Sequence, residues 1–325
     1  GVSKMQKLQM STQEGNNVYV SAIRGNFDDA QTGVKRIFTD PAIAAKLNEN
    51  GMAFSSANSI NWGRVLPQIV YYISAYCDVI AEKGETDGIN VVVPTGNFGN
   101  ILAAYYAKKM GVPIKKLICA SNSNKVLTDF ISTGVYDRNR SFYTTISPSM
   151  DILISSNLER LIYDMSGCDS ALISEYMKRL SSEGKYEVSD EIKACLKNDF
   201  VGGYATDGET KAAILDTYKR YGYLIDTHTG VAVKVYNDYV AATGDTTETV
   251  IVSTASPYKF AADVLDAVDS TVKNPGGIEA MNVLSSVTGT AVPRPLQGLD
   301  KRAVRFSDVC DSSEMAATVF GCLGI

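Results

Sequence analysis

The pattern of apolar and polar residues along this chain changes repeatedly between the period of a strand and the period of a helix. Short apolar or alternating runs predict strands at residues 17–23, 90–94, 116–120 and 249–253. Longer runs with apolar residues every three or four positions predict helices at residues 27–38, 64–82, 99–110, 124–132, 230–242 and 258–267, and a helix-rich region at 157–220. Residues 293–299, which hold two of the nine prolines, are predicted to be an extended surface segment.

This order of elements indicates an α/β fold. Strands that alternate with helices form βαβ units, which build a mainly parallel sheet with helices on both faces. The runs at 90–94 and 249–253 are almost continuously apolar, as expected for strands that are buried on both faces. The sequence therefore predicts a twisted, mainly parallel sheet flanked by helices.

The most informative segment is the loop T-G-N-F-G-N, which joins the strand at 90–94 to the helix at 99–110. Gly96 and Gly99 allow the backbone to approach a ligand or to adopt a positive φ. The start of a helix offers unpaired N–H groups and the positive end of the helix dipole, which suit a phosphate. The amides of Asn97 and Asn100 could donate to such a ligand, or they could simply cap the helix in a tight connection.

Two nucleotide-binding alternatives are disfavoured. The chain contains neither G-x-G-x-x-G at this loop nor a G-x-x-x-x-G-K-[ST] motif anywhere. These motifs carry the phosphates of dinucleotides and of ATP, respectively. A cradle for one phosphate group is the better functional interpretation of the loop.

Composition and charge narrow the function further. The 325 residues are 45% hydrophobic and 21% charged, with a net charge of −5, which argues against a nucleic-acid partner. No run approaches the roughly 18–20 apolar residues of a membrane span, so no membrane partner is expected. The six cysteines contain no C-x-x-C pair, which favours reduced thiols and a cytoplasmic location.

His228 is the single histidine of the chain. A zinc site with several histidines is therefore impossible, and no G-x-S-x-G motif is present to complete a serine triad. If the protein is an enzyme, we expect its chemistry to depend on a cofactor and predict no metal site.

Several segments, taken in order, resemble those of the threonine synthase family of pyridoxal 5'-phosphate (PLP) enzymes. The loop G-N-F-G-N is similar to the family's phosphate loop. Six further segments of the family have matches here. Residues 25–31 resemble its G-x-F-D-D-x-Q segment, residues 55–64 its N-S-I-N-W-x-R segment, and residues 147–152 its S-P-S-M-D-I segment. Residues 156–160 resemble its S-N-x-E-R segment, residues 226–230 its D-x-H-T segment, and residues 253–260 its S-T-A-x-P-x-K-F segment. The resemblance covers nearly the whole chain.

The resemblance implies a fold-type-II PLP enzyme, similar in fold to the tryptophan synthase β subunit. It implies conversion of O-phospho-L-homoserine and water into L-threonine and phosphate by γ-elimination and β-addition, in threonine biosynthesis. Residues 1–60 would be the remnant of a small inserted α/β domain. Residues 61–325 would form the large PLP-binding domain with a C-terminal extension.

The resemblance also implies roles for individual residues. The PLP phosphate would be gripped, mainly by backbone N–H groups, by Gly96, Asn97, Phe98, Gly99 and Asn100. Thr254 would donate a hydrogen bond to the pyridine nitrogen, although a strand-end cap is the alternative role.

A second polar set is expected to bind the substrate phosphate or carboxylate, and its members are Asn58, Ser59, Asn61 and Arg64. Arg64 suits a bidentate contact with an anion. A helix start with asparagine or serine as N-cap is the alternative for this set. His228 is placed to contact the phosphate leaving group, but a lone histidine is more often structural. Asp151, Asn157 and Arg160 match the family without an implied role.

The family binds PLP through a Schiff-base lysine in an F-K-D block that precedes every matched segment, and this chain has no such block. We therefore expect a C-terminal portion that needs the missing N-terminal segment of the same protein and is inactive alone. A naturally split or degenerate protein is the alternative.

Two other functions stay open. The first is another enzyme of this class, either a threonine-synthase-like phospho-lyase or a β-eliminating dehydratase. Residues 55–64 and 156–160 favour threonine synthase over the dehydratases but separate it less well from phospho-lyases. The second is a non-catalytic phosphate-binding module. An upstream F-K-D block would favour an enzyme.

Overall fold

The computed structural model describes residues 4–25 and 27–325. Asn26 and the side chains of Phe27, Asp28 and Gln31, which belong to the predicted 25–31 motif, lie outside the described part. The chain divides into two compact units, one of residues 57–273 and one that combines residues 1–56 with residues 274–325.

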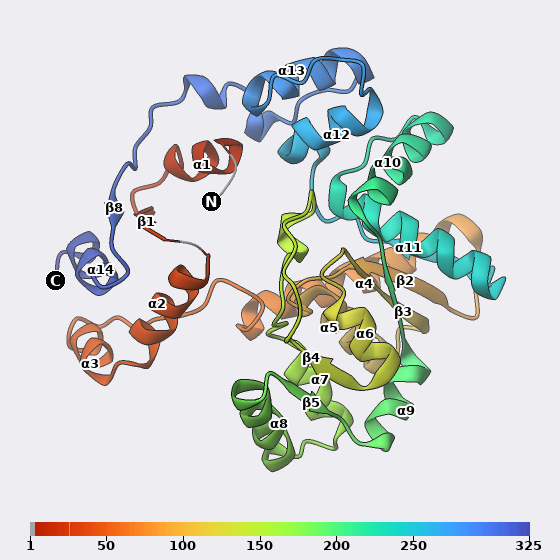
Figure 1. Ribbon diagram of the computed structural model, residues 1–325, viewed down its shortest axis with the longest axis horizontal. Helices are drawn as coiled ribbons and strands as arrows, with labels where there is room; N and C mark the ends of the chain where they lie inside the picture. Colours follow the sequence, from red (N-terminus) through yellow and green to blue (C-terminus); the bar gives the residue numbers. More distant parts are fainter. Residues whose placement is uncertain (1–3, 26) are drawn as a thin grey trace. The chain divides into compact units, whose positions relative to one another are not determined.

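The larger unit is built on a parallel sheet of four strands in the order β6-β3-β2-β7 (Figure 1). These strands are β2 (Ile89–Pro94), β3 (Ile114–Ser121), β6 (Phe200–Tyr204) and β7 (Thr249–Ile251). Every residue of β2 is buried. The predicted α/β fold with a mainly parallel sheet is confirmed.

Alternate side chains of β2 enter two separate cores, as the period of a strand requires. Val91 and Val93 pack with residues of α4 (Trp62–Lys83), α5 (Gly99–Lys109), α6 (Val126–Thr133), α7 (Leu158–Met165) and α9 (Asp190–Asp199). Val92 packs on the opposite face with Val231 and Val235 of α11 (Thr227–Thr243). Helices thus cover both faces of the sheet.

The remaining elements of this unit surround the sheet. They are β4 (Val135–Asp137), α8 (Ser170–Ser182), β5 (Lys185–Glu187), α10 (Asp207–Tyr221), α12 (Ala261–Val268) and two short 3₁₀ turns, Pro148–Met150 and Pro257–Phe260. β4 and β5 pair antiparallel and stack Tyr136 on Tyr186 with ring centroids 5.4 Å apart.

The helix-rich prediction for residues 157–220 missed β5 and β6. The sequence of β6, F-V-G-G-Y, hides a strand because its two glycines carry no side chain. A Cβ on Gly202 would lie 2.9 Å from the Thr128 backbone, and one on Gly203 would lie 2.5 Å from Val235. The glycines therefore let α6 and α11 approach β6 closely.

The smaller unit joins both ends of the chain. It contains α1 (Lys4–Ser11), β1 (Ala22–Ile23), α2 (Phe27–Thr39), α3 (Pro41–Glu49), α13 (Gly277–Thr288), β8 (Val309–Cys310) and α14 (Met315–Leu323). β1 and β8 pair in parallel, with Ala22 opposite Val309. The strand predicted at 17–23 is thus only two residues long, and the segment at 293–299 contains the 3₁₀ turn Arg294–Leu296.

The unit boundaries differ from the expected domain boundaries. The expected division fell near residue 60 and left residues 274–325 with the large domain. In the structure, the first boundary follows Ser56, and residues 274–325 belong to the same unit as the N-terminal residues. The β1–β8 pairing is one physical reason for this grouping.

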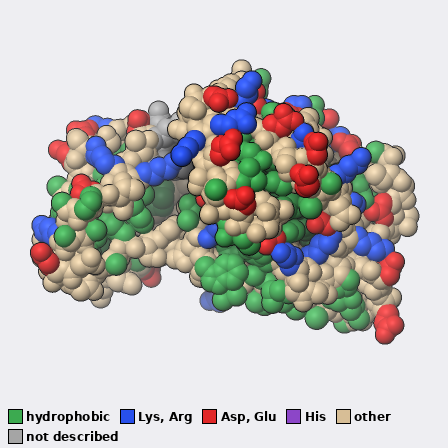
Figure 2. All heavy atoms as spheres, turned by 90° about the horizontal axis from the view of Figure 1, so that it is seen from below, with side chains coloured by type: hydrophobic (Ala, Val, Ile, Leu, Met, Phe, Trp, Pro, Cys, Tyr) green, Lys and Arg blue, Asp and Glu red, His purple; other side chains and the backbone are tan. Residues whose placement is uncertain are grey.

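Hydrophobic side chains are partly exposed on the surface, and Figure 2 shows them gathered in patches on one face of the molecule. Trp62, Leu66 and Val70, four residues apart on α4, are each at least half exposed. Among the described residues, no helix combines the length and the apolar character that a membrane span needs.

Asp245 connects β2, α11 and the segment before β7 by hydrogen bonds at the amino end of β2. Its carboxylate accepts hydrogen bonds from the Asn90 amide at 2.8 Å, the Tyr239 hydroxyl at 2.6 Å and the Thr247 N–H at 2.9 Å. Asn90 lies in β2 and is fully buried. The hydrogen bonds from Thr247, Tyr239 and Asn90 hold the pKa of Asp245 well below its usual range.

This lowered pKa predicts an acid-sensitive fold. A carboxyl whose pKa is lower in the folded state stabilises that state above its unfolded pKa of about 4, and the stabilisation is lost as the pH falls below that value. We expect the free energy of unfolding to fall between about pH 5 and pH 2 less steeply in Asp245→Asn than in the unsubstituted chain. Urea unfolding at several pH values measures this, and parallel curves for the two proteins would contradict it.

Candidate functional site

The T-G-N-F-G-N loop follows β2 directly and leads into α5, as the sequence predicts. Phe98 is the N-cap of α5 and has a φ of 63°, a left-handed conformation that is uncommon for a residue other than glycine. Its side chain is buried and packs against Phe200 of β6, with ring centroids 5.9 Å apart. The buried ring anchors this conformation, and the strained backbone turns the loop into the helix.

The loop leaves its backbone donors unpaired. The N–H groups of Asn97, Phe98, Gly99 and Asn100 donate no hydrogen bond to any residue that the structure describes. The loop carbonyls are instead held from behind: the Gly96 oxygen accepts from Ser155 Oγ at 2.8 Å, and the Asn97 oxygen accepts from Asn157. Consecutive free N–H groups at the start of a helix form a concave site for an anion.

Both glycines of the loop are required by their neighbours. A Cβ on Gly96 would lie 2.5 Å from the Ser149 carbonyl oxygen, and a Cβ on Gly99 would lie 2.4 Å from Ser59 Cβ. The loop is thus packed between the 147–151 segment and the residues that precede α4. Only glycine fits at these two positions, so the contacts with Ser149 and Ser59 fix the path of the loop backbone and the direction of its N–H groups.

Thr254 lies at the same edge of the sheet as the loop. β7 runs parallel to β2 with Val92 opposite Ile251, and the Val252 N–H donates to the Val92 oxygen at 2.9 Å. The chain therefore leaves β7 beside the point at which it leaves β2, and Thr254 is exposed there. The carboxyl edge of a parallel sheet is where α/β proteins bind ligands.

The predicted substrate-binding set is divided. Ser59 contacts the glycine loop, as the clash with a Cβ on Gly99 shows, and its hydroxyl accepts from Gln68 Nε2 at 3.1 Å. Asn61 is the N-cap of α4 and accepts from the Gly63 N–H, which matches the alternative helix-start role. Asn58 accepts from the Ile60 N–H. Arg64 is exposed on the first turns of α4.

Asn157 and Arg160 gain structural roles that their matched segment did not specify. The Asn157 side chain donates to the Asn97 oxygen at 2.8 Å, and its backbone N–H donates to the same oxygen at 3.1 Å. Arg160 donates through Nη1 to the Ser59 oxygen at 2.8 Å. The first turn of α7 therefore holds the glycine loop and Ser59 together.

Asp151 is the centre of a polar network behind the site. Its carboxylate accepts from Asn122 at 2.7 Å, from Asn124 at 3.1 Å and from both the N–H and the hydroxyl of Thr145. Asn122 and Asn124 follow β3 and are buried. Neither asparagine is predicted from the sequence, where its only signal is a position just after a predicted strand.

His228 is engaged on both ring nitrogens. Nδ1 lies 3.0 Å from Asp226 Oδ1, and Nε2 accepts a hydrogen bond from the Ser149 N–H at 3.2 Å. The ring is buried against Phe260. Because an N–H faces Nε2, the proton of the neutral ring belongs on Nδ1, where Asp226 accepts it. The geometry supports the structural role: His228 holds Ser149, whose carbonyl abuts Gly96.

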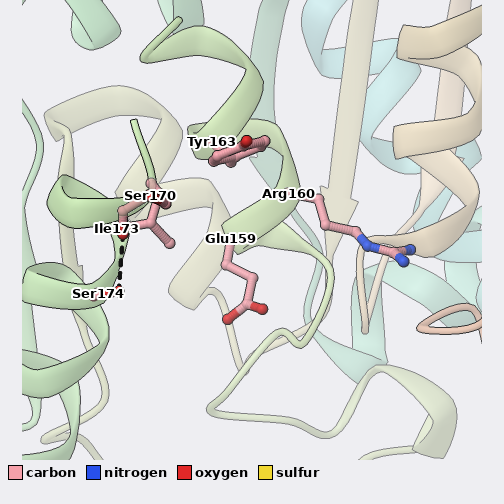
Figure 3. Close-up of a pocket in the computed structure, with 6 residues that line it drawn as sticks. All are labelled: Glu159, Arg160, Tyr163, Ser170, Ile173 and Ser174. Carbon is pink, nitrogen blue, oxygen red and sulfur yellow. Dashed lines mark hydrogen bonds between the residues drawn. The ribbon is translucent and has the colours of Figure 1, made fainter. Parts of the chain in front are cut away.

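A shallow pocket of 260 Å³ lies between α7 and α8 (Figure 3). It is lined by Glu159, Arg160, Tyr163, Ser170, Ile173 and Ser174. The guanidinium of Arg160 points away from the other five side chains and toward the Ser59 and Ile60 carbonyls. The guanidinium of Arg160, the one cationic group among the lining residues, is therefore directed out of the pocket. We assign the pocket no role at the glycine loop.

Comparison with known proteins agrees with this geometry. The family described as "Threonine synthase, C-terminal" matches residues 229–319. The chain is 47% identical over 273 residues to threonine synthase-like 1 of Homo sapiens, covering 82% of this chain and 36% of the relative. It is 36% identical over 287 residues to threonine synthase of Methylobacillus glycogenes, covering 87% and 58%.

Solved structures give the same result. PLP-bound threonine synthase from Brucella melitensis superposes with a TM-score of 0.81 at 34% identity, covering 98% of this chain and 62% of that one. Threonine synthase from yeast gives a TM-score of 0.82 at 30% identity, covering 99% and 63%. The chain thus spans between about a third and two thirds of the length of these relatives.

The crowding at Gly96 predicts a large effect of a small substitution. In Gly96→Ala the added methyl would meet the Ser149 backbone, so we expect the free energy of unfolding to fall by about 1–3 kcal/mol. The matched control is Gly208→Ala in α10, where nothing lies within 4 Å of the added methyl. Urea unfolding of both variants measures the difference, and an equal response would show that the loop can relax.

The hydrogen bonds of His228 predict different effects for two substitutions. His228→Leu leaves the Ser149 N–H without its acceptor, and we expect a loss of about 0.5–1.5 kcal/mol of unfolding free energy. His228→Gln keeps an acceptor oxygen and should lose less. Equal losses in the two variants would mean that the hydrogen bond to Ser149 is not what stabilises this part of the fold.

Proposed function

This chain belongs to the threonine synthase-like family of fold-type-II enzymes, and from that premise we propose that it forms the PLP-binding part of a threonine synthase. The proposed reaction converts O-phospho-L-homoserine and water into L-threonine and phosphate. The observation that carries the proposal is the glycine loop, whose unpaired N–H groups lie at the carboxyl edge of the sheet.

The residues of the loop fit the phosphate of PLP. Four N–H groups, from Asn97 to Asn100, have no acceptor among the described residues, while Ser149 and Ser59 fill the space beside Gly96 and Gly99 and hold the loop backbone in place. N–H groups donate to phosphate oxygens and gain from the positive end of the α5 dipole. Because the donors are backbone groups fixed by the loop, they require no charged side chain. The net charge of −5 is therefore no obstacle.

PLP, when bound, supplies the electron sink for the reaction, and the residues of the chain orient it and its substrate. Thr254 follows β7 at the same edge of the sheet as the loop, which supports the proposal that its hydroxyl donates to the pyridine nitrogen. A neutral hydroxyl at that nitrogen does not force the ring to be protonated. Ser59, which contacts the loop and is held by Arg160, is the best placed of the proposed substrate-binding residues.

The proposed activity also needs the lysine to which PLP is attached. We propose that it comes from a polypeptide segment outside residues 1–325, because the segments that resemble the family include no F-K-D block. The shares of the relatives that this chain covers, 36% to 63%, are compatible with a partner segment from the same protein.

One alternative activity has a specific observation in its favour. The chain is 47% identical to a protein named threonine synthase-like 1 but 36% identical to a protein named threonine synthase. A threonine-synthase-like phospho-lyase would release phosphate from a similar substrate without forming threonine. The phosphate loop serves both activities equally, so product analysis has to separate them.

The test measures phosphate and threonine released from O-phospho-L-homoserine by this chain within its natural polypeptide. We expect equal amounts of the two products, and no product when the PLP-attached lysine is changed to alanine. Phosphate without threonine would replace the proposal with the phospho-lyase, and neither product would favour a non-catalytic phosphate-binding module. His228→Gln serves as a control that alters a buried residue near the loop and keeps its hydrogen bond.

A further inference from the structure

A buried tyrosine holds the side chain of the last residue of the glycine loop. The hydroxyl of Tyr72, on α4, donates to Asn100 Oδ1 at 2.5 Å. Tyr72 is 2% exposed and belongs to the core in which α4 packs on α5. Burial raises the pKa of Tyr72, so its hydroxyl keeps its proton and stays a donor. Asn100 lies in the first turn of α5, among the unpaired N–H groups.

The other end of the Asn100 amide reaches solvent. Its nitrogen donates to no residue that the structure describes. In the described part of the chain, no buried side-chain nitrogen or oxygen lacks a hydrogen-bond partner. The amide nitrogen is therefore accessible, and it adds two N–H donors to the first turn of α5.

The two ends of an amide have opposite polarity, so its orientation decides how the site treats an anion. If the amide turned over, its oxygen would be presented to the phosphate and would repel it. The Tyr72 hydroxyl would then accept from the amide, and its own buried proton would have no acceptor. Leaving a buried donor unpaired is unfavourable. The tyrosine therefore favours one orientation, with the amide nitrogen outward.

We propose that Tyr72 is a positioning residue that orients the Asn100 amide so that it donates to the phosphate bound at the glycine loop. This inference rests on the proposed function of the loop as a phosphate site. It adds a residue from α4, outside the loop and outside the segments that resemble the family, to the determinants of anion affinity. Tyr72 acts without touching the ligand.

The test is a double-substitution cycle on the full 325-residue chain, with calorimetric titration of inorganic phosphate and, separately, of PLP. We expect Tyr72→Phe to weaken phosphate binding by roughly three- to tenfold, the equivalent of one hydrogen bond. Asn100→Ala should weaken it by a similar factor. Adding Tyr72→Phe to Asn100→Ala should weaken binding no further, because the amide that Tyr72 orients is already absent.

A matched control separates orientation from loss of a buried hydroxyl. Tyr105, on α5, is also buried and donates to Asp164 Oδ2 at 2.6 Å, without contacting Asn100. Tyr105→Phe should leave phosphate affinity unchanged, whatever its effect on thermal stability. If Tyr72→Phe fails to fold, Asn100→Asp tests whether the side chain that Tyr72 holds faces the anion, since its carboxylate can still accept from the Tyr72 hydroxyl. We expect it to bind phosphate more weakly than Asn100→Ala.

Three outcomes would overturn the inference. Unchanged phosphate affinity in Tyr72→Phe would show that the orientation does not matter. An equal effect of Tyr72→Phe with and without Asn100 would show a general structural role. Absence of phosphate and PLP binding by the unsubstituted chain would overturn the proposed site as well, which distinguishes failure of the function from failure of this inference alone.

Discussion

The unpaired backbone N–H groups at the start of α5 are the constraint on which the rest of the site depends. Such groups are normally satisfied by caps, and here the N-cap position holds Phe98, whose side chain is apolar and buried. The ring is anchored in the core against Phe200, which keeps the backbone in a left-handed conformation. The N-terminus of α5 therefore has no side-chain cap, and its first backbone N–H groups stay available to a ligand.

The surroundings of the loop make this arrangement rigid. Asn157 and Ser155 bind the loop carbonyls, His228 fixes Ser149 against Gly96, and Tyr72 holds Asn100 from the α4 side. None of these contacts uses a loop N–H. Such supporting hydrogen bonds hold a binding constellation in its productive geometry. The residues that build the site therefore come from four helices or turns that are distant in sequence.

The sequence was sufficient to predict the parallel sheet, the glycine loop and the family. These features leave local signals: a continuously apolar β2, two glycines three residues apart, and contiguous motifs. The strand β6 was missed because Gly202 and Gly203 remove the apolar pattern where helices approach closely. The Tyr72–Asn100 and Asp151–Asn122 contacts were not predictable, since they depend on how α4, β3 and the 147–151 segment meet in space. The strand predicted at 17–23 was too long, since only Ala22 and Ile23 pair in β1, and the two-residue strand β8 has no periodicity to detect.

The pairing of β1 with β8 has a consequence for the order in which the chain folds during its translation. The smaller unit needs Ala22 and Val309 at once, so on the ribosome β1 cannot pair until residue 309 has been translated. Residues 57–273 are continuous and can collapse around their own sheet first. During that interval β1 lacks its partner strand β8, so the smaller unit stays incomplete while the larger one can already fold.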